Sequence, residues 1–229
     1  IAKIAGTFII IISIIVTATW LLIVQDTKNN IRIWANNQKK NEIDVNWKNI
    51  SIDGYPININ IKINEPSILA KVFESQISWN PTFIRLKFSP TKPKSIKYYS
   101  PGSHALNVMY GATKWSAEII SETLKGEIFF KPKKNFRKKI HGEFTDLQLN
   151  LPGREKVLEI HQGKFESAVK NAALINTKLL NPFKNSFSFN LSAQNIKITN
   201  NLLSENTIKS FGNIIDELSF ELALNGYLN

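Results

Sequence analysis

Regular alternation of apolar and polar residues is the feature that most constrains the fold of this chain. In residues 57–63 every second position is isoleucine: Ile57, Ile59, Ile61 and Ile63. The positions between them are asparagine or lysine, and because successive side chains of a β-strand point to opposite faces, this pattern predicts a half-buried strand. Similar alternation recurs in 84–88, 147–151, 187–193 and 218–224. The chain is therefore predicted to be mainly β, with antiparallel strands that have one apolar face.

The parity of the alternation changes within at least three stretches, at 47–50, 144–147 and 193–196. Such a change means either an extra residue inside a strand, as in a β-bulge, or the end of one strand followed by a turn. Bulges bend and twist a sheet, so we expect the sheet to be long and curved. Helical spacing is sparse after residue 43 and clearest in 204–218, which predicts one or two short helices.

The N-terminal segment has the composition of a membrane anchor. Residues 4–25 contain no charge and lie between Lys3 and Asp26. As a helix this run is about 33 Å long, enough to cross a hydrocarbon core of about 30 Å. A cleaved signal peptide is the alternative, but a small-residue cleavage site does not stand out after the run. We expect a transmembrane signal anchor at 1–25, a juxtamembrane helix at 26–42, and a β-rich envelope domain at 43–229 that continues beyond residue 229.

Composition and motifs exclude several kinds of site. The chain has 229 residues, no cysteine, and three histidines that are far apart in the sequence. Disulfides and cysteine-based zinc sites are impossible, and the sequence contains no HExxH, GxSxG, Walker or GxGxxG pattern. His161 follows Glu159 on one parity of a strand, where surface exposure is expected. We predict that the protein is not an enzyme and has no catalytic residue, metal or cofactor.

Basic residues are in excess, with a formal net charge of +11. AT-rich codon usage is one explanation, because Asn and Ile are abundant too. Six basic residues fall within nine positions: Lys131, Lys133, Lys134, Arg137, Lys138 and Lys139. Residues 75–117 carry six more, with several aromatic residues and no acid. This combination can indicate nucleic acid, but beside a membrane anchor it indicates anionic headgroups, with a solvated hairpin tip as the alternative for 131–139. We expect a membrane partner and no nucleic acid.

The order of motifs resembles a known family. The apolar span is followed by "VNWKNISIDGYPININIKINEP", which contains the turn Gly54, Tyr55 and Pro56, and then by "ISWNP", which contains Trp79 and Pro81. This arrangement is similar to the proteobacterial family catalogued as domain of unknown function 2125, which is distantly AsmA-like. Asn58 is a departure, because an arginine is common near this place in the family. The family has no established activity, so the resemblance implies no catalytic residue.

Orientation in the membrane is predicted differently by charge and by the resemblance. Four basic residues follow the span, namely Lys28, Arg32, Lys39 and Lys40. The positive-inside rule would therefore place the large domain in the cytoplasm. The resemblance implies instead a single-pass inner-membrane anchor with a soluble domain in the periplasm, and we follow the resemblance.

Two functional hypotheses of different classes follow. The isoleucine face of 57–63 either packs against another layer as an ordinary core, which is the default, or lines a groove for acyl chains. One functional hypothesis is that the protein is non-enzymatic and binds or conveys lipid for envelope maintenance. The other is that it is a membrane-anchored scaffold subunit that binds an envelope protein, for example by strand addition at a sheet edge.

Overall fold

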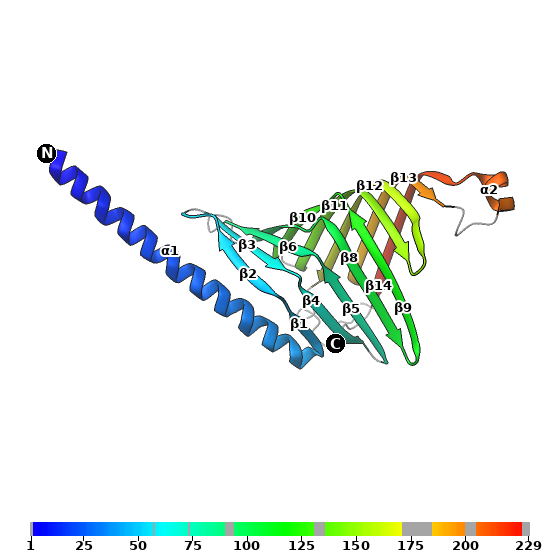
Figure 1. The fold of residues 1–229 in the computed structure, drawn as a ribbon, viewed down its shortest axis with the longest axis horizontal. Coiled ribbons are helices and arrows are strands. Elements are labelled where there is room, and N and C mark those ends of the chain that lie inside the picture. Colours follow the sequence, from blue (N-terminus) through cyan, green and yellow to red (C-terminus); the bar gives the residue numbers. More distant parts are fainter. Residues whose placement is uncertain are drawn as a thin grey trace.

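The computed structural model describes residues 2–56, 58–72, 74–89, 94–130, 136–170, 185–199 and 205–225. These residues form a long N-terminal helix, one curved and unclosed antiparallel sheet, and a short second helix (Figure 1). The predicted fold class, mainly β with an apolar N-terminal helix and a long curved sheet, is confirmed.

The N-terminal helix α1 (Ala2–Gln38) is continuous and is followed by one 3₁₀ turn, η1 (Lys39–Asn41). The span and the juxtamembrane helix expected from the sequence are thus parts of one helix. It is long and apolar enough to cross a membrane. Glu42 ends it in a left-handed conformation (φ 58°), and the backbone N–H of Glu42 donates to the carbonyl of Lys39 at 3.1 Å. The end of the helix packs against the first strand.

Fourteen described strands form the sheet, and the chain crosses it in successive passes. The first five passes consist of two strands each: β1 (Ile43–Asn46) and β2 (Asn49–Asp53), β3 (Ile59–Asn64) and β4 (Ser67–Val72), β5 (Ser75–Pro81) and β6 (Phe83–Phe88), β7 (Ser95–Tyr99) and β8 (Gly102–Tyr110), β9 (Thr113–Ser121) and β10 (Thr123–Phe130). The later passes are single long strands: β11 (Phe136–Leu151), β12 (Arg154–Lys170), β13 (Asn185–Ile198) and β14 (Ile214–Asn225).

Each pass pairs antiparallel with the pass before it and the pass after it. The two halves of the early passes pair separately, β2 with β3 and β1 with β4, and this continues up to β11. Strand β11 receives both halves on one edge, because Thr145 faces Thr123 of β10 and Gln148 faces Ile120 of β9. Its other edge pairs with β12, followed by β13 and β14. The sheet is therefore one meander.

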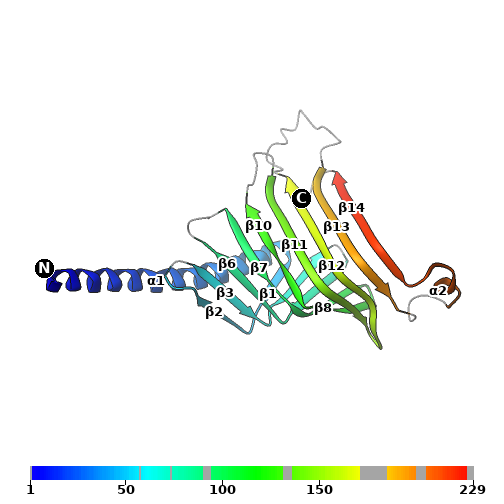
Figure 2. The ribbon, with the colours of Figure 1, turned by 90° about the horizontal axis from the view of Figure 1, so that it is seen from above.

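A line of interruptions crosses every pass, and we call it the fold line. In the early passes it falls between the two strands, and in the later passes it is a residue left out of the ladder: 47–48, 65–66, 82, 100–101, 122, Asp146, His161, Asn195 and Asp216. We call the side with β2, β3, β6, β7 and β10 the first wing and the side with β1, β4, β5, β8 and β9 the second wing. Figures 1 and 2 show the two wings diverging from α1.

Backbone hydrogen bonding continues across the fold line. The N–H of Glu65 donates to the carbonyl of Thr82 at 2.9 Å, and the N–H of Thr82 donates to the carbonyl of Ser103 at 2.9 Å. The N–H of Glu122 donates to the carbonyl of Thr145 at 3.2 Å. These bonds satisfy backbone groups that the interrupted ladder would otherwise leave unpaired. The sheet is therefore hydrogen-bonded across the fold line.

The fold line explains the parity changes seen in the sequence. At 47–50 strand β1 ends and β2 begins, whereas at Asp146 and Asn195 the strand runs on with one residue in the left-handed region, at φ 47° and φ 52°. Asp and Asn tolerate this conformation better than most residues. Both alternatives drawn from the sequence therefore occur. One non-extended residue shifts the alternation by one, so the apolar side chains of both halves stay on one side of the sheet.

The second helix is shorter than the sequence pattern predicted. Helix α2 (Glu205–Phe211) occupies only the first half of 204–218, and residues from Ile214 onward belong to β14. Gly212 ends the helix with φ 76°, and its N–H donates to the carbonyl of Ile208 at 2.8 Å. A left-handed glycine is the usual helix stop, and it outweighs the helical spacing that continues to Ile215.

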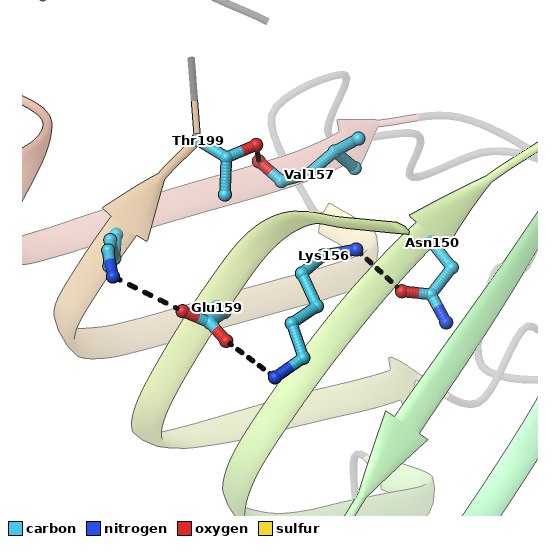
Figure 3. Close-up of polar contacts among 6 residues, drawn as sticks. Asn150, Lys156, Val157, Glu159 and Thr199 are labelled. Atoms are coloured by element: carbon cyan, nitrogen blue, oxygen red, sulfur yellow. Dashed lines mark hydrogen bonds and ion pairs between the residues drawn. The ribbon is translucent and has the colours of Figure 1, made fainter. Parts of the chain in front are cut away.

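The turn between β11 and β12 is fixed to β13 by polar contacts (Figure 3). Val157 is fully buried, and its carbonyl accepts the N–H of Thr199 at 3.2 Å and the hydroxyl of Thr199 at 3.4 Å. Lys156 has φ 48°, and its N–H donates to Oδ1 of Asn150 at 2.8 Å. Its Nζ lies 3.7 Å from Glu159. This corner holds the three long strands together at the end of the second wing.

Candidate functional site: the apolar face of the sheet

A single row of facing residues crosses the first wing from β2 to β14. Its members are apolar, apart from two glycines and one tyrosine hydroxyl: Ile52, Ile61, Leu86, Tyr98, Gly126, Gly142, Phe165, Leu191 and Phe220. Residues that face each other across a ladder lie on the same side of a sheet. The row therefore belongs to one continuous surface, which we call the apolar face.

The opposite side of the first wing is as consistently polar, and we call it the polar face. The row next to the one above reads Ser51, Lys62, Arg85, Tyr99, Lys125, Glu143, Lys164, Ser192 and Ser219. The two rows differ by one residue in every strand. The alternation that predicts the strands thus also separates the two faces over the whole width of the sheet.

The apolar face continues onto the second wing. One row there is Val45, Ile68, Trp79, Leu106 and Ala117. A second row is His104, Ile119, Leu149, Leu158 and Ile198. Because each pass shifts its alternation at the fold line, these rows lie on the same side as the row of the first wing.

Burial varies strongly along the apolar face. Ile61 in β3 is 9% exposed and Phe144 beside the fold line is 5% exposed, whereas Phe220 in β14 is 49% exposed. Helix α1 packs against β1 at one edge of the sheet, and α2 lies beyond the ends of β13 and β14 (Figures 1 and 2). Neither helix covers the face formed by the described strands. Within the described part of the chain, the neighbours of Ile61 and Phe144 are therefore side chains of the same curved sheet.

Aromatic side chains lie over glycines in the middle of the face. The hydroxyl of Tyr98 donates to the carbonyl of His141 at 3.2 Å and passes over Gly126 and Gly142. A Cβ at either glycine would collide with that hydroxyl, and a Cβ at Gly142 would also collide with Phe165. Glycine is therefore required for this close approach. Burial raises the pKa of Tyr98 to about 12, so the hydroxyl stays a hydrogen-bond donor.

His104 is a buried polar group on the second wing. Its Nε2 donates to the carbonyl of Ser100 at 2.8 Å, and its Nδ1 accepts the indole N–H of Trp79 at 3.2 Å. Both ring nitrogens are used by a neutral imidazole. Burial lowers the pKa of His104, opposed in part by the bond to Ser100. The residue is thus a satisfied structural histidine rather than a free acid or base.

Charged residues gather on the fold line. Lys48 pairs with Glu65 at 2.6 Å, and Nδ1 of His161 lies 2.8 Å from Oδ1 of Asp146. The hydrogen bond to His161 and then that to Glu122 lower the pKa of Asp146, whereas the hydrogen bond and the charge of Asp146 raise the pKa of Glu122. His161 is exposed, as expected, but its partner is Asp146 and not Glu159. Within the described part of the chain, His, Asp and Glu do not form a cluster able to hold a metal ion.

The polar face carries an open groove of about 1210 Å³ that crosses the strands of the first wing from β6 to β14. In the middle of the groove Lys125 pairs with Glu143 at 3.1 Å. Glu166, also in the wall, pairs with Lys139 at 2.7 Å. At β6 and β7 the walls are basic: Arg85, Lys87 and Lys97. The groove offers mixed charge in the middle and positive charge at one end.

The predicted apolar residues lie where the alternation placed them. Ile59, Ile61 and Ile63 belong to β3 and lie on the apolar face, and Ile57 lies outside the described residues. The choice between core and groove is not settled by burial alone, because the same face is closed at β3 and open at β14. A role of these isoleucines in ligand binding stays a prediction.

The predicted turn of Gly54, Tyr55 and Pro56 joins β2 to β3. Gly54 has φ 105°, and a Cβ there would collide with the carbonyl of Asn58, whose N–H donates to the Gly54 carbonyl at 2.9 Å. The tip of the turn contacts α1. The Tyr55 hydroxyl is 3.0 Å from Oγ1 of Thr17, and its ring meets Trp20 edge-on at 6.0 Å between centroids. Sequence patterns do not predict this contact, because it joins residues 38 positions apart.

The predicted basic stretch is only partly described. Lys131, Lys133 and Lys134 lie outside the described residues, and Arg137 belongs to β11 but its side chain is not described. Lys138 is exposed, and its Nζ lies 6.0 Å from the centre of the Phe130 ring. Lys139 lies on the opposite face and pairs with Glu166. Lys138 and Lys139 therefore do not form one patch. This separation could have been predicted from the sequence, because adjacent side chains of a strand point to opposite faces. Contact of this stretch with an anionic surface stays a prediction.

Comparison with known proteins adds no relative. No protein-family model matches the chain, and no curated protein or solved structure is significantly similar to it. The resemblance to domain of unknown function 2125 and to AsmA-like proteins therefore stays a prediction.

Proposed function

We propose that this protein is anchored in a membrane by α1 and binds the acyl chains of lipids on the apolar face of its sheet. The observation that carries the proposal is the row from Ile52 to Phe220, which is apolar apart from two glycines and the Tyr98 hydroxyl and has no second layer over it among the described residues. Contiguous exposed apolar surface is uncommon on soluble monomers and usually marks a binding surface. A membrane anchor keeps this surface close to a source of acyl chains.

The chemistry of the face supports an apolar ligand. Leu218, Phe220 and Leu222 of β14 are all well exposed and alternate with Ser219 and Glu221 on the other face. An acyl chain needs no hydrogen-bond partner and gains stability from removing such surface from water. The face offers contact area and not reactive groups, so a role in holding or conveying lipid fits it better than catalysis. By the resemblance, the anchor lies in the inner membrane and the sheet in the periplasm.

Photo-crosslinking of lipid tests this proposal. The full chain, reconstituted in lipid nanodiscs that contain a fatty acid or phospholipid with a photoactivatable chain, is expected to be labelled on the apolar face. Replacing Phe220 and Leu222 by Ser removes exposed apolar surface and should reduce labelling of the sheet several-fold. Glu221→Gln, which lies between them on the polar face, is the matched control and should leave labelling unchanged. Equal labelling of the sheet in all three proteins would disprove acyl-chain binding there.

The sheet edge favours a second candidate function, a scaffold that binds a protein partner. Among the described strands β14 pairs only with β13, so the backbone groups on its outer edge are available for an added strand. Hydrogen exchange distinguishes the two functions. A partner strand would protect the edge amides of β14, whereas acyl chains on the apolar face would leave their exchange rates unchanged.

A further inference from the structure

We propose that the basic end of the groove on the polar face binds the phosphate group of a water-soluble ligand. The site is one block of four side chains on β6 and β7: Arg85, Lys87, Lys97 and Tyr99. All four point to the polar face, on the side of the sheet opposite to the proposed acyl-chain surface. The site therefore goes beyond lipid binding, and either proposal can fail without the other.

The register of β6 and β7 brings the three cations together. Arg85 faces Tyr99, and Lys87 faces Lys97. Facing residues of antiparallel strands are about 5 Å apart at Cβ, and alternate residues of one strand are about 7 Å apart. The four side chains therefore occupy the corners of an area of about 5 by 7 Å. Lysine and arginine side chains are long enough to converge on a phosphate placed above the centre of this area.

Like charges face each other twice at this end of the groove. Lys87 faces Lys97, and on the other edge of β6 Arg85 faces Lys62. Such an arrangement destabilises a sheet. Within the described part of the chain none of these four cations forms an ion pair, although Glu127 of β10 faces Lys97. A bound anion would relieve this repulsion, which the described side chains leave uncompensated.

Arg85 is oriented by two aromatic rings on the polar face. Its guanidinium carbon lies 5.9 Å from the centre of the Phe83 ring and 5.9 Å from the centre of the Tyr99 ring. A guanidinium that is oriented before binding loses less freedom when it pairs with phosphate through two parallel N–H bonds. Lys87 and Lys97 are exposed and have no partner among the described residues, so their ammonium groups are available to a ligand.

Charge and the rest of the groove select the ligand. Three cations around one point match a phosphate ester, which carries nearly two negative charges at neutral pH, better than a carboxylate, which carries one. From this end the groove continues toward β14 between walls of polar and charged side chains. Apolar residues of its lining, such as Phe165 and Leu191, have their side chains on the apolar face. The ligand is therefore a hydrophilic phosphate ester rather than a lipid.

Isothermal titration calorimetry of the full chain in phosphatidylcholine nanodiscs, with inorganic pyrophosphate as the probe, tests this site. Pyrophosphate is expected to bind one-to-one, and acetate at equal ionic strength is expected not to bind. Lys87→Gln with Lys97→Gln removes two of the three cations and should weaken pyrophosphate binding at least about tenfold. The matched control, Lys114→Gln with Lys209→Gln, removes the same charge elsewhere and should bind like the wild type. Equal weakening in both variants, or no binding to the wild type, would overturn the proposal.

A competitor distinguishes a soluble ligand from a lipid phosphate. Short-chain phosphatidylglycerol, added to the same titration, should leave the pyrophosphate affinity unchanged. Displacement of pyrophosphate by this lipid would assign the cations to a headgroup and overturn the claim of a hydrophilic ligand.

Stability without ligand separates binding from a structural role of the cations. Lys87→Gln relieves the repulsion with Lys97 and should raise the melting temperature of the ligand-free protein in detergent by about 1 °C. Pyrophosphate should raise the melting temperature of the wild type and have a smaller effect on this variant. Lys114→Gln should behave like the wild type in both measurements. A lower melting temperature for ligand-free Lys87→Gln would show that Lys87 stabilises the fold itself and would contradict the proposal.

Discussion

The two ends of the apolar face have the same sequence pattern and different surroundings. In β3, Ile61 has Ile52 on one side and Leu86 on the other and is almost fully buried. In β14, Phe220 has Leu191 on one side and no described strand on the other, and about half of it is exposed. Alternation therefore determines which face a side chain joins. The number and size of its cross-strand neighbours determine how far water is excluded.

The largest effect is expected from a charge at the closed end of the face. Ile61→Asp buries a carboxylate without a partner and should destabilise the protein by about 4 kcal/mol, enough to prevent stable folding. Phe220→Asp leaves the new charge in contact with water and should cost about 1 kcal/mol. Thermal unfolding of both variants in the same detergent checks the ratio. Similar losses at the two positions would show that the two ends are not different environments.

The next effect concerns the glycines between these ends. At Gly126 a Cβ would collide with the backbone carbonyl of His141, whereas at Gly142 it would collide only with the outer ends of the Tyr98 and Phe165 rings. The aromatic rings can rotate away from a new Cβ, whereas the backbone carbonyl of a paired strand is held in place by the ladder. Gly126→Ala should therefore cost about 3 kcal/mol and Gly142→Ala about 1 kcal/mol. Denaturant unfolding measures both, and a larger loss for Gly142→Ala would show that the rings are fixed more firmly than the ladder.

Protein stability is expected to depend on pH through His104, which is buried in the second wing. Because burial lowers the pKa of His104, the unfolded chain takes up a proton as the pH falls through the ordinary value of about 6.5 while the folded chain does not. The contribution of His104 to stability is thus complete above about pH 6.5 and decreases below it. Melting temperatures between pH 8 and pH 5.5 should show this decrease. His104→Gln should reduce the slope, and the exposed His161→Gln serves as the control.

The smallest effect is expected on the polar face. Lys125 and Glu143 form an ion pair at 3.1 Å with about half of each side chain exposed. Such pairs contribute little, so Lys125→Gln should change the free energy of unfolding by less than about 0.5 kcal/mol. A loss as large as that of Gly142→Ala would contradict the view that stability resides on the apolar face. Salt titration of the wild type provides an independent measure of the same contribution.

Much of the architecture follows from local sequence. The isoleucines of β3 were placed on one face because alternation reports side-chain direction directly, and the parity changes reported the fold line in three passes. The same change from Ile77, Trp79 and Pro81 to Ile84, Leu86 and Phe88 marks the fold line in another pass and could have been found by the same count.

Features that depend on pairing between distant segments could not be predicted in this way. The hydrogen bond between Trp79 and His104 joins residues 25 positions apart, and both look like ordinary strand residues in the sequence. The contact of Tyr55 with Thr17 depends on how the sheet lies against α1. Local patterns carry no information about these distances, so the candidate site was visible only in its individual strands.

The meander has a consequence for how the protein is made. Every pass finds its sheet partners in the passes directly before and after it, so no strand has to wait for a distant segment of the chain. Folding can then proceed pass by pass from β1 toward β14 as the polypeptide is synthesised, with a small loop to close at each step. Two consecutive passes could also be removed or duplicated without changing the direction of the strands that follow. The width of the apolar face is thus a quantity that evolution can adjust in steps, independently of α1.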